Sequence, residues 1–291
     1  MDRRVINLYD TFTHGGMSRR DFMDRLIGLT GSAAAAAAIL PLLQNNYAQA
    51  AIVAADDPRL VAERVAYDSP KGKINGYLVR PTAKGKRPAI IVIQENRGLN
   101  PHIEDVARRL AVEGFLVLAP DLLSVSGGTP PDEDKARELH AKTDLKDITA
   151  AAVAAAPFLL THPESDGNVG VVGFCFGGGV ANRMAAERPE LKAVVVYYGM
   201  QIPADQVPSI RAPLLLHYAE LDERVNAGIA AYESALKANG KRHKIFMYPS
   251  VNHAFNNDTG GARYNKEAAD LAWDRTLAFF KENLGAPPRP K

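Results

Sequence analysis

The sequence predicts an α/β fold with a mostly parallel central sheet that helices cover on both faces. Short apolar runs such as residues 88–94 alternate with segments of helical periodicity such as residues 102–113, which is the pattern of strands crossing over through helices. No linker or internal repeat divides residues 55–285. The 291 residues are 46% hydrophobic and 23% charged, with a formal net charge of +2. This globular composition excludes long disorder and gives no reason to expect a nucleic-acid partner.

Residues 1–50 carry the pattern of an export signal. The pair Arg19-Arg20, with Phe22 close behind, resembles the twin-arginine motif, and an alanine-rich apolar stretch follows over residues 26–43. The segment Ala48-Gln49-Ala50 then offers the small residues of an A-x-A cleavage site.

These features predict that the twin-arginine export machinery carries the precursor and that cleavage occurs near Ala50. The mature protein would then be residues 51–291, in the periplasm. A membrane anchor or an alanine-rich helix of a cytosolic protein is the alternative for the first fifty residues.

The expected elements follow the same periodicities along the chain. Two weakly alternating segments separated by Pro70-Lys71-Gly72 predict a hairpin, and the later apolar runs predict strands buried on both faces. We expect strands at residues 61–68, 73–80, 88–94, 115–119, 169–172, 191–196, 213–218 and 244–248. We expect helices at residues 102–113, 144–160, 176–187, 225–238 and 265–283. Residues 124–134, which contain two glycines and two prolines, predict a long loop beside a pocket.

The only cysteine, Cys175, lies where a strand turns into a helix, between Gly173 and Gly177. This G-x-C-x-G spacing matches a nucleophile elbow, in which the neighbours two positions away must lack side chains because the turn is tight. A buried structural cysteine and a phosphate-binding turn are the alternatives, although no P-loop Lys-Ser/Thr follows. A single cysteine excludes an intramolecular disulfide and a multi-thiolate metal site, and we expect neither a metal nor a cofactor.

An acid and a base follow the elbow in the order that α/β-hydrolases use. Asp222 follows the strand expected at residues 213–218, and His253 follows the strand expected at residues 244–248. The remaining histidines are expected to be ordinary surface or core residues, with His14 belonging to the export signal; they are His14, His102, His140, His162, His217 and His243.

Together these segments resemble the dienelactone hydrolase family of α/β-hydrolases. The matching pieces are Gln94-Glu95, Gly173–Gly178, Tyr197-Tyr198-Gly199, Asp222 and His253-Ala254-Phe255. The resemblance implies a Cys175, Asp222 and His253 triad, with Glu95 beside the nucleophile.

The resemblance also concerns the substrate. The family holds a substrate carboxylate with two arginines, and neither has a counterpart here: Asn257 stands at one position, and Ser124, Val125 and Ser126 stand at the other. Arg97 is therefore the candidate cation, with Tyr198 as a second substrate-binding candidate.

The predicted activity is hydrolysis of a carboxylic ester or lactone through an acyl-enzyme on Cys175. The backbone N–H groups of Phe176 and Asn96 are the expected oxyanion hole, and Glu95 would hold the resting thiol proton or orient the sulfur. The alternatives are a non-catalytic exported binding or stress protein, and a redox sensor that uses Cys175 without a resolving cysteine.

Overall fold

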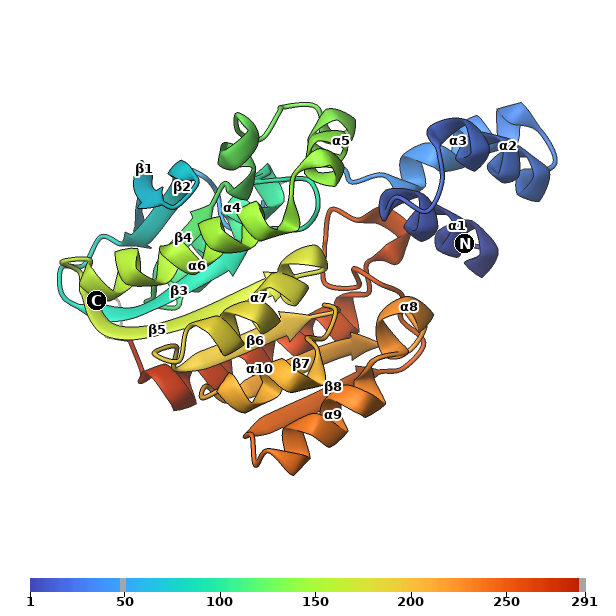
Figure 1. The fold of residues 1–291 in the computed structure, drawn as a ribbon. Coiled ribbons are helices and arrows are strands. Elements are labelled where there is room, and N and C mark those ends of the chain that lie inside the picture. Colours follow the sequence, from blue (N-terminus) through green and yellow to red (C-terminus); the bar gives the residue numbers. More distant parts are fainter. Residues whose placement is uncertain (48–50, 288–291) are drawn as a thin grey trace.

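The computed structural model describes residues 1–47 and 51–287, and its centre is one mixed sheet (Figure 1). Among the described residues the sheet has eight strands in the order β1-β2-β4-β3-β5-β6-β7-β8. β1 pairs antiparallel with β2, and β2 with β4, whereas all the other pairs are parallel. The strands are β1 Leu60–Ser69, β2 Gly72–Pro81, β3 Arg87–Ile93, β4 Leu116–Pro120, β5 Ser165–Phe174, β6 Ala193–Tyr197, β7 Leu214–Ala219 and β8 His243–Tyr248. The mostly parallel α/β sheet is thereby confirmed, and each of these strands overlaps a predicted one.

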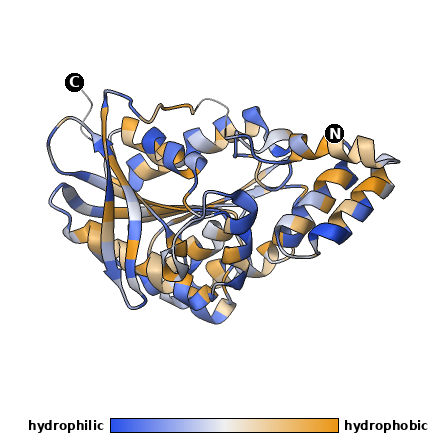
Figure 2. Ribbon diagram, turned by 90° about the horizontal axis from the view of Figure 1, so that it is seen from above, coloured by the Kyte–Doolittle hydropathy of each residue, from blue (hydrophilic) through white to orange (hydrophobic). Residues whose placement is uncertain are grey.

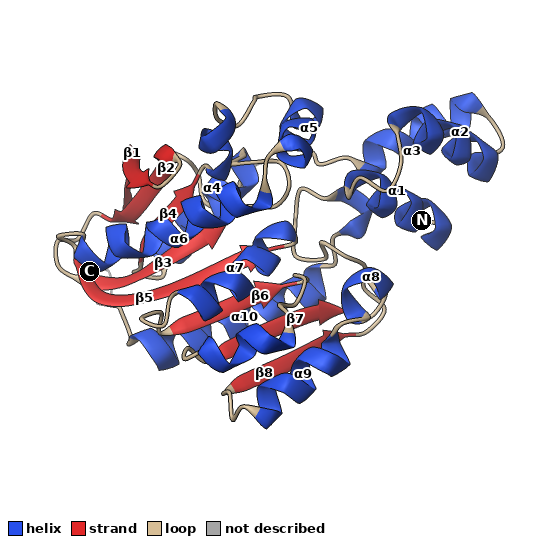
Figure 3. Ribbon diagram, viewed as in Figure 1, coloured by secondary structure: helices blue, strands red, loops and turns tan. Residues whose placement is uncertain are grey.

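Helices cover both faces of the sheet, as Figure 3 shows. α6 (Leu145–Thr161), α7 (Phe176–Glu187) and α9 (Ile229–Ala238) pack on one face, and α4 (Pro101–Val112) and α10 (Lys266–Leu284) pack on the other. Alternate side chains of each strand enter the two cores: Ile91 and Ile93 of β3 face the first, and Ile90 and Val92 the second. Burial on both faces explains why the central strands are continuous apolar runs.

The helix predicted over residues 225–238 is wrong in its bounds, because two helices occupy this stretch. α8 spans Glu223–Asn226 and begins earlier than predicted, since the Asp222 carboxylate accepts a hydrogen bond from the backbone N–H of Val225 and caps the helix. α9 starts after Gly228, where a Cβ atom would come within 2.2 Å of Oε1 of Gln201. The break therefore occurs at the poorest helix former of the segment.

The unbroken loop predicted over residues 124–134 is also wrong. A 3-10 turn, η1 (Leu122–Ser126), occupies its beginning, and α5 (Glu133–Lys142) starts inside its end. Asp121 accepts hydrogen bonds from the backbone of Leu123 and Thr129, and Asp132 caps α5 through the N–H of Lys135. Acidic caps thus convert a glycine- and proline-rich stretch into ordered turns. Two further 3-10 turns are η2 (Ala204–Ser209) and η3 (Gly261–Arg263).

Residues 1–47 contain the helices α1 (Arg3–Thr13), α2 (Arg19–Thr30) and α3 (Ala33–Leu43), drawn in blue in Figure 1. Their apolar side chains form a cluster of their own, visible as orange segments in Figure 2; its buried members are Val5, Ile6, Tyr9, Phe12, Phe22, Leu26, Ala36 and Leu43. We call residues 1–47 the N-terminal cap, because they lie over the carboxyl end of the sheet.

The cap overlaps the predicted export signal. The predicted cleavage site at Ala48–Ala50 lies outside the described residues, and export stays a prediction. None of the individual helices in the described ranges is long and apolar enough to cross a membrane; α2 and α3 reach that composition only as a pair bent by 111°.

Candidate active site

The fold brings four predicted site residues to one edge of the sheet. Glu95 follows β3, Cys175 follows β5, Asp222 follows β7 and His253 follows β8. The carboxyl ends of parallel strands share an edge, so residues separated by up to 158 positions converge there. All four are buried.

Cys175 has the backbone conformation of a nucleophile elbow. Its φ of 55° and ψ of −119° are strained for a residue with a side chain. A Cβ atom on Gly173 would lie 1.9 Å from the carbonyl oxygen of Gly177, and one on Gly177 would lie 2.4 Å from that of Gln94. The glycines are therefore required by the close approach of backbone segments, as the spacing predicts.

His253 and Asp222 form a tight pair. Nδ1 of His253 lies 2.5 Å from Oδ2 of Asp222, while Oδ1 of the same carboxylate accepts from the N–H of Val225. The bond fixes the ring so that Nε2 faces away from the carboxylate. This Nε2 is buried and has no hydrogen-bond partner among the described residues. The pair has the geometry of a base and its orienting acid.

His14 of the cap is the site residue that the sequence analysis missed. Its Nε2 lies 3.2 Å from Sγ of Cys175, and its ring stands edge-on to the ring of His253 with a centroid separation of 4.8 Å. Nδ1 of His14 lies 2.8 Å from the backbone oxygen of Asp10 and 3.3 Å from Oδ1 of the same residue. The sulfur therefore lies between two histidines, each supported by an aspartate.

The two histidines govern the ionisation of the thiol. Burial alone would raise the pKa of Cys175, but the positive charges of His253 and His14 outweigh it and lower the pKa to about 6. Burial opposes the charge on His14 as well, yet the negative charge on Cys175 and the bond to Asp10 raise its pKa to about 9. The pKa of His253 is also raised, against its burial, by the charges of Asp222 and Cys175. At neutral pH the site therefore favours a thiolate between imidazolium rings.

Polar contacts fix the cap over this site. The Asn96 side chain donates to the backbone oxygen of Thr13 at 2.8 Å, and an Nη of Arg97 lies 3.4 Å from the hydroxyl of Tyr9. The backbone N–H of Asn46 donates to the carbonyl of Thr259. Under this cover Cys175 is only 7% exposed.

Two cation–π contacts add to the docking. The guanidinium of Arg137 lies 4.4 Å from the ring centroid of Phe12, and that of Arg263 lies 5.1 Å from the ring centroid of Tyr9. Each contact of this kind contributes about 0.5–2 kcal/mol. The cap is thus attached by several independent interactions besides His14.

The predicted oxyanion donors lie at the pocket wall. The N–H of Phe176 opens α7 directly after Cys175, and Asn96 follows β3. Neither backbone N–H has an acceptor among the described residues. Both are free to donate to an oxygen that develops charge beside the sulfur.

Glu95 follows β3 at the edge of the sheet where the Cys175 elbow lies, and its hydrogen-bond partner is a residue that the sequence analysis did not assign to it. Nδ2 of Asn257 donates to Oε2 of Glu95 at 2.9 Å, and Oδ1 of Asn257 accepts from the hydroxyl and N–H of Thr259. Asn257, which replaces the expected arginine, therefore holds a carboxylate of the protein itself.

The two substrate-binding candidates differ in availability. Arg97 is 5% exposed and forms an ion pair with Glu133, so in the capped structure its charge is already matched. Tyr198 packs its ring 4.9 Å from that of His253, and its buried hydroxyl lacks a hydrogen-bond partner in the described part of the chain. Tyr198 is therefore the candidate with an open polar atom.

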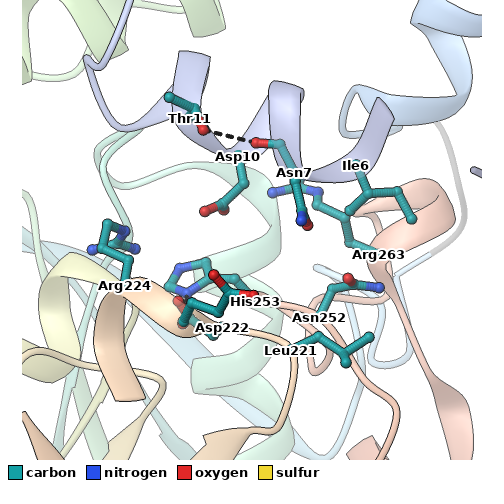
Figure 4. A pocket seen from close by; sticks show the side chains of 11 residues that line it. Ile6, Asn7, Asp10, Thr11, Leu221, Asp222, Arg224, Asn252, His253 and Arg263 are labelled. Atoms are coloured by element: carbon teal, nitrogen blue, oxygen red, sulfur yellow. Dashed lines mark hydrogen bonds and ion pairs between the residues drawn. The ribbon is translucent and has the colours of Figure 1, made fainter. Parts of the chain in front are cut away.

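Two pockets flank the covered thiol of Cys175. One, of about 270 Å³, lies between α1 and the Asp222–His253 pair, and Figure 4 shows Asp10 reaching into it from the cap. The other, of about 480 Å³, is lined by His14, Asn96, His140 and Phe176 among others. The second pocket contains the residues of both oxyanion donors.

Comparison with known proteins identifies the family to which most of the chain is similar. The model of the dienelactone hydrolase family matches residues 74–284, and a family model described as YqhI-like matches residues 1–29. A candidate hydrolase fragment from Escherichia coli K12, YghX, is 53% identical over 112 residues, which cover 38% of this chain and 96% of that one.

Longer relatives cover most of the chain. A candidate carboxymethylenebutenolidase from Synechocystis is 34% identical over 230 residues, covering 73% of this chain and 93% of its own. The crystal structure of a candidate dienelactone hydrolase from Klebsiella pneumoniae superposes with a TM-score of 0.69 at 31% identity, over 77% of this chain and 99% of that one. The chain therefore belongs to the dienelactone hydrolase family, whose members are hydrolases of carboxylic esters and lactones.

Proposed function

We propose that this protein hydrolyses a carboxylic ester or lactone through a covalent acyl-enzyme on Cys175, with His253 and Asp222 as base and orienting acid. The observation that carries the proposal is the 2.5 Å bond between Nδ1 of His253 and Oδ2 of Asp222, at the edge where the Cys175 elbow lies. It leaves Nε2 free on the side of the sulfur, as nucleophilic catalysis requires.

The reaction proceeds in two halves. The Cys175 thiolate attacks the carbonyl carbon, and the carbonyl oxygen takes the negative charge between the N–H groups of Phe176 and Asn96. The imidazolium of His253 gives its proton to the leaving alkoxide as the C–O bond breaks, which leaves a thioester. His253 then takes a proton from water, hydroxide adds to the thioester carbon, and the acid departs as the thiolate re-forms.

The pocket wall that remains without the cap supports an acyl group with an apolar portion. Beside the two oxyanion donors this wall includes the apolar side chains of Ile148 and Phe176, whereas Thr13, His14 and Gly15 on the opposite side belong to the cap. Tyr198 supplies the unpartnered hydroxyl for a polar substituent. The tested substrates are therefore short acyl esters, lactones and thioesters.

Access to Cys175 requires that the cap move or be removed. We also propose, from Arg19-Arg20 and the A-x-A segment at residues 48–50, that the chain is exported to the periplasm by the twin-arginine route. Cleavage near Ala50 would remove α1–α3 and with them His14. The intact mass of the periplasmic and cytoplasmic protein tests this: a periplasmic form that begins near Ala51 supports export, and only full-length cytoplasmic protein contradicts it.

The activity test compares the full chain with residues 51–291 on the ester, lactone and thioester panel. We expect turnover by the shorter form and loss of at least about 10³-fold in the Cys175→Ala variant of it, since removal of a covalent nucleophile has costs of this order or larger. The non-catalytic binding protein would be favoured instead if neither form hydrolyses any member of the panel and the Cys175 thiol reacts only after unfolding.

A further inference from the structure

We propose that His14, Cys175 and His253 form a zinc site, which is assembled when the N-terminal cap docks on the catalytic domain, residues 51–287. Sγ of Cys175 and one ring nitrogen of each histidine lie within 4.8 Å of one another. One thiolate and two imidazoles are a donor set that zinc prefers, and magnesium and calcium do not. The site goes beyond the proposed hydrolysis and does not depend on it.

Both histidines are held in the way that metal-binding histidines are held. Nδ1 of His253 is bonded to Asp222, and Nδ1 of His14 to the backbone oxygen of Asp10, with the Asp10 carboxylate 3.3 Å away. Each bond leaves Nε2 as the nitrogen that faces the sulfur. Such second contacts fix the ring and raise its basicity toward a metal.

The distances match a tetrahedral ion after a small closure. Zn–S and Zn–N bonds of about 2.3 and 2.0–2.1 Å separate the donor atoms of a tetrahedral site by about 3.3–3.6 Å. His14 Nε2 already lies 3.2 Å from Sγ. The largest separation among the three donor atoms, up to 4.8 Å, closes with a shift of about 1 Å of one side chain.

An unpartnered atom also points to a ligand at this place. Nε2 of His253 is buried in a residue that is 4% exposed, and no hydrogen bond of standard geometry satisfies it among the described residues, so its interaction in this site is with the sulfur of Cys175. A buried polar atom without a partner is destabilising, and a metal ion would satisfy it. The fourth position would be filled by water from the adjoining pockets.

Zinc at this position would hold the cap closed. It would bridge α1 to the elbow and to the loop after β8, and the protons carried by the ligand atoms would pass to solvent on binding. Because the metal would occupy both Sγ and Nε2 of His253, the capped form would be blocked until zinc or the cap is removed. The sequence-based expectation of no metal site rested on the single cysteine, with His14 assigned to the export signal.

The experiment is a zinc titration of the full chain, produced without processing, freed of metal by a chelator and checked by intact mass for the presence of residue 14. We expect one zinc per chain, and with Co²⁺ a thiolate-to-metal charge-transfer band and tetrahedral visible absorption. His14→Ala should weaken zinc binding by more than about 100-fold. Asp10→Asn keeps the backbone oxygen that Nδ1 of His14 contacts and removes only the carboxylate charge, so it should weaken zinc binding by less than His14→Ala does.

The matched control is His140→Ala, which removes another histidine of the same pocket wall that lies outside the cluster and should leave zinc affinity unchanged. Circular dichroism verifies that each variant is folded. Three results would each overturn the proposal. The full chain binds no stoichiometric zinc, the cobalt complex lacks the charge-transfer band, or the His14→Ala variant binds zinc as tightly as the natural sequence.

Discussion

Nε2 of His14 lies 3.2 Å from Sγ of Cys175, although 161 positions separate the two residues in the chain. This contact joins the first helix of the protein to the elbow at the centre of its sheet. It makes the N-terminal cap part of the site. The cap both lowers the pKa of the Cys175 thiol, through the charge of His14, and covers the thiol. The predictions below separate these two effects.

Removal of residues 1–50 should expose the thiol. Cys175 is 7% exposed beneath the cap, so we expect a bulky maleimide to label the shortened protein at least about 10-fold faster than the full chain. The measurement is the second-order labelling rate at pH 7.5 in the presence of a chelator. Equal rates for the two forms would show that the cap does not cover the thiol in solution, and Cys175→Ala provides the blank.

The reactivity of Cys175 should follow an acidic ionisation. Its pKa is lowered to about 6, so the thiolate is fully present above that value and is lost as the pH falls through it. Alkylation of the metal-free full chain by iodoacetamide should therefore reach half its maximum near pH 6. In His14→Gln, which lacks one of the two positive charges, the midpoint should move upward. A midpoint near 9 in the natural sequence, the value of an unperturbed thiol, would contradict the account.

Gly173→Ala should destabilise the elbow. The new Cβ would lie 1.9 Å from the backbone oxygen of Gly177, which no rotation of a side chain can relieve. We expect a loss of at least about 2 kcal/mol in the free energy of unfolding, measured by urea denaturation. Gly179→Ala in α7 is the matched control, because its Cβ meets nothing closer than 3.6 Å and alanine favours the helix; its effect should be neutral or stabilising by up to about 1 kcal/mol.

Glu95→Gln should alter how the hydrolysis rate depends on pH. The amide oxygen still accepts from Nδ2 of Asn257, so the packing is kept while the negative charge beside the site is lost. If the charge orients the sulfur or holds its proton, the pH–rate profile of the shortened enzyme on a short ester shifts. A profile that coincides with that of the natural sequence would remove Glu95 from the mechanism and leave it as a structural partner of Asn257.

Much of the catalytic domain could be predicted from the sequence because its signals are local. Buried parallel strands read as apolar runs, and the glycines around Cys175 mark a turn that tolerates no side chain. Asp222 and His253 could be placed because each follows a strand, and strand ends meet at one edge of the sheet.

The cap could not be predicted in the same way. The alanines of residues 33–38 are compatible both with an export signal and with a packed helix. Together with Arg19-Arg20 they favoured the export signal, whereas the structure folds the cap that contains them over the site. One signal was present: Tyr9 and Phe12 share a helical face with Val5, and Asp10 precedes His14 by one turn. That pattern does not identify Cys175 as the partner of His14, because docking between distant segments depends on the shapes of folded surfaces, which the sequence pattern does not give.

The central claim is that Cys175 carries the acyl group with His253 as its base, and intact-protein mass spectrometry tests it most directly. Residues 51–291 are mixed with an activated short-chain ester and quenched in acid within the first turnover. We predict the mass of one acyl group, located on the peptide that contains Cys175, with its removal slowed in His253→Ala. An unacylated Cys175 during turnover, or full activity in Cys175→Ala, would contradict the mechanism.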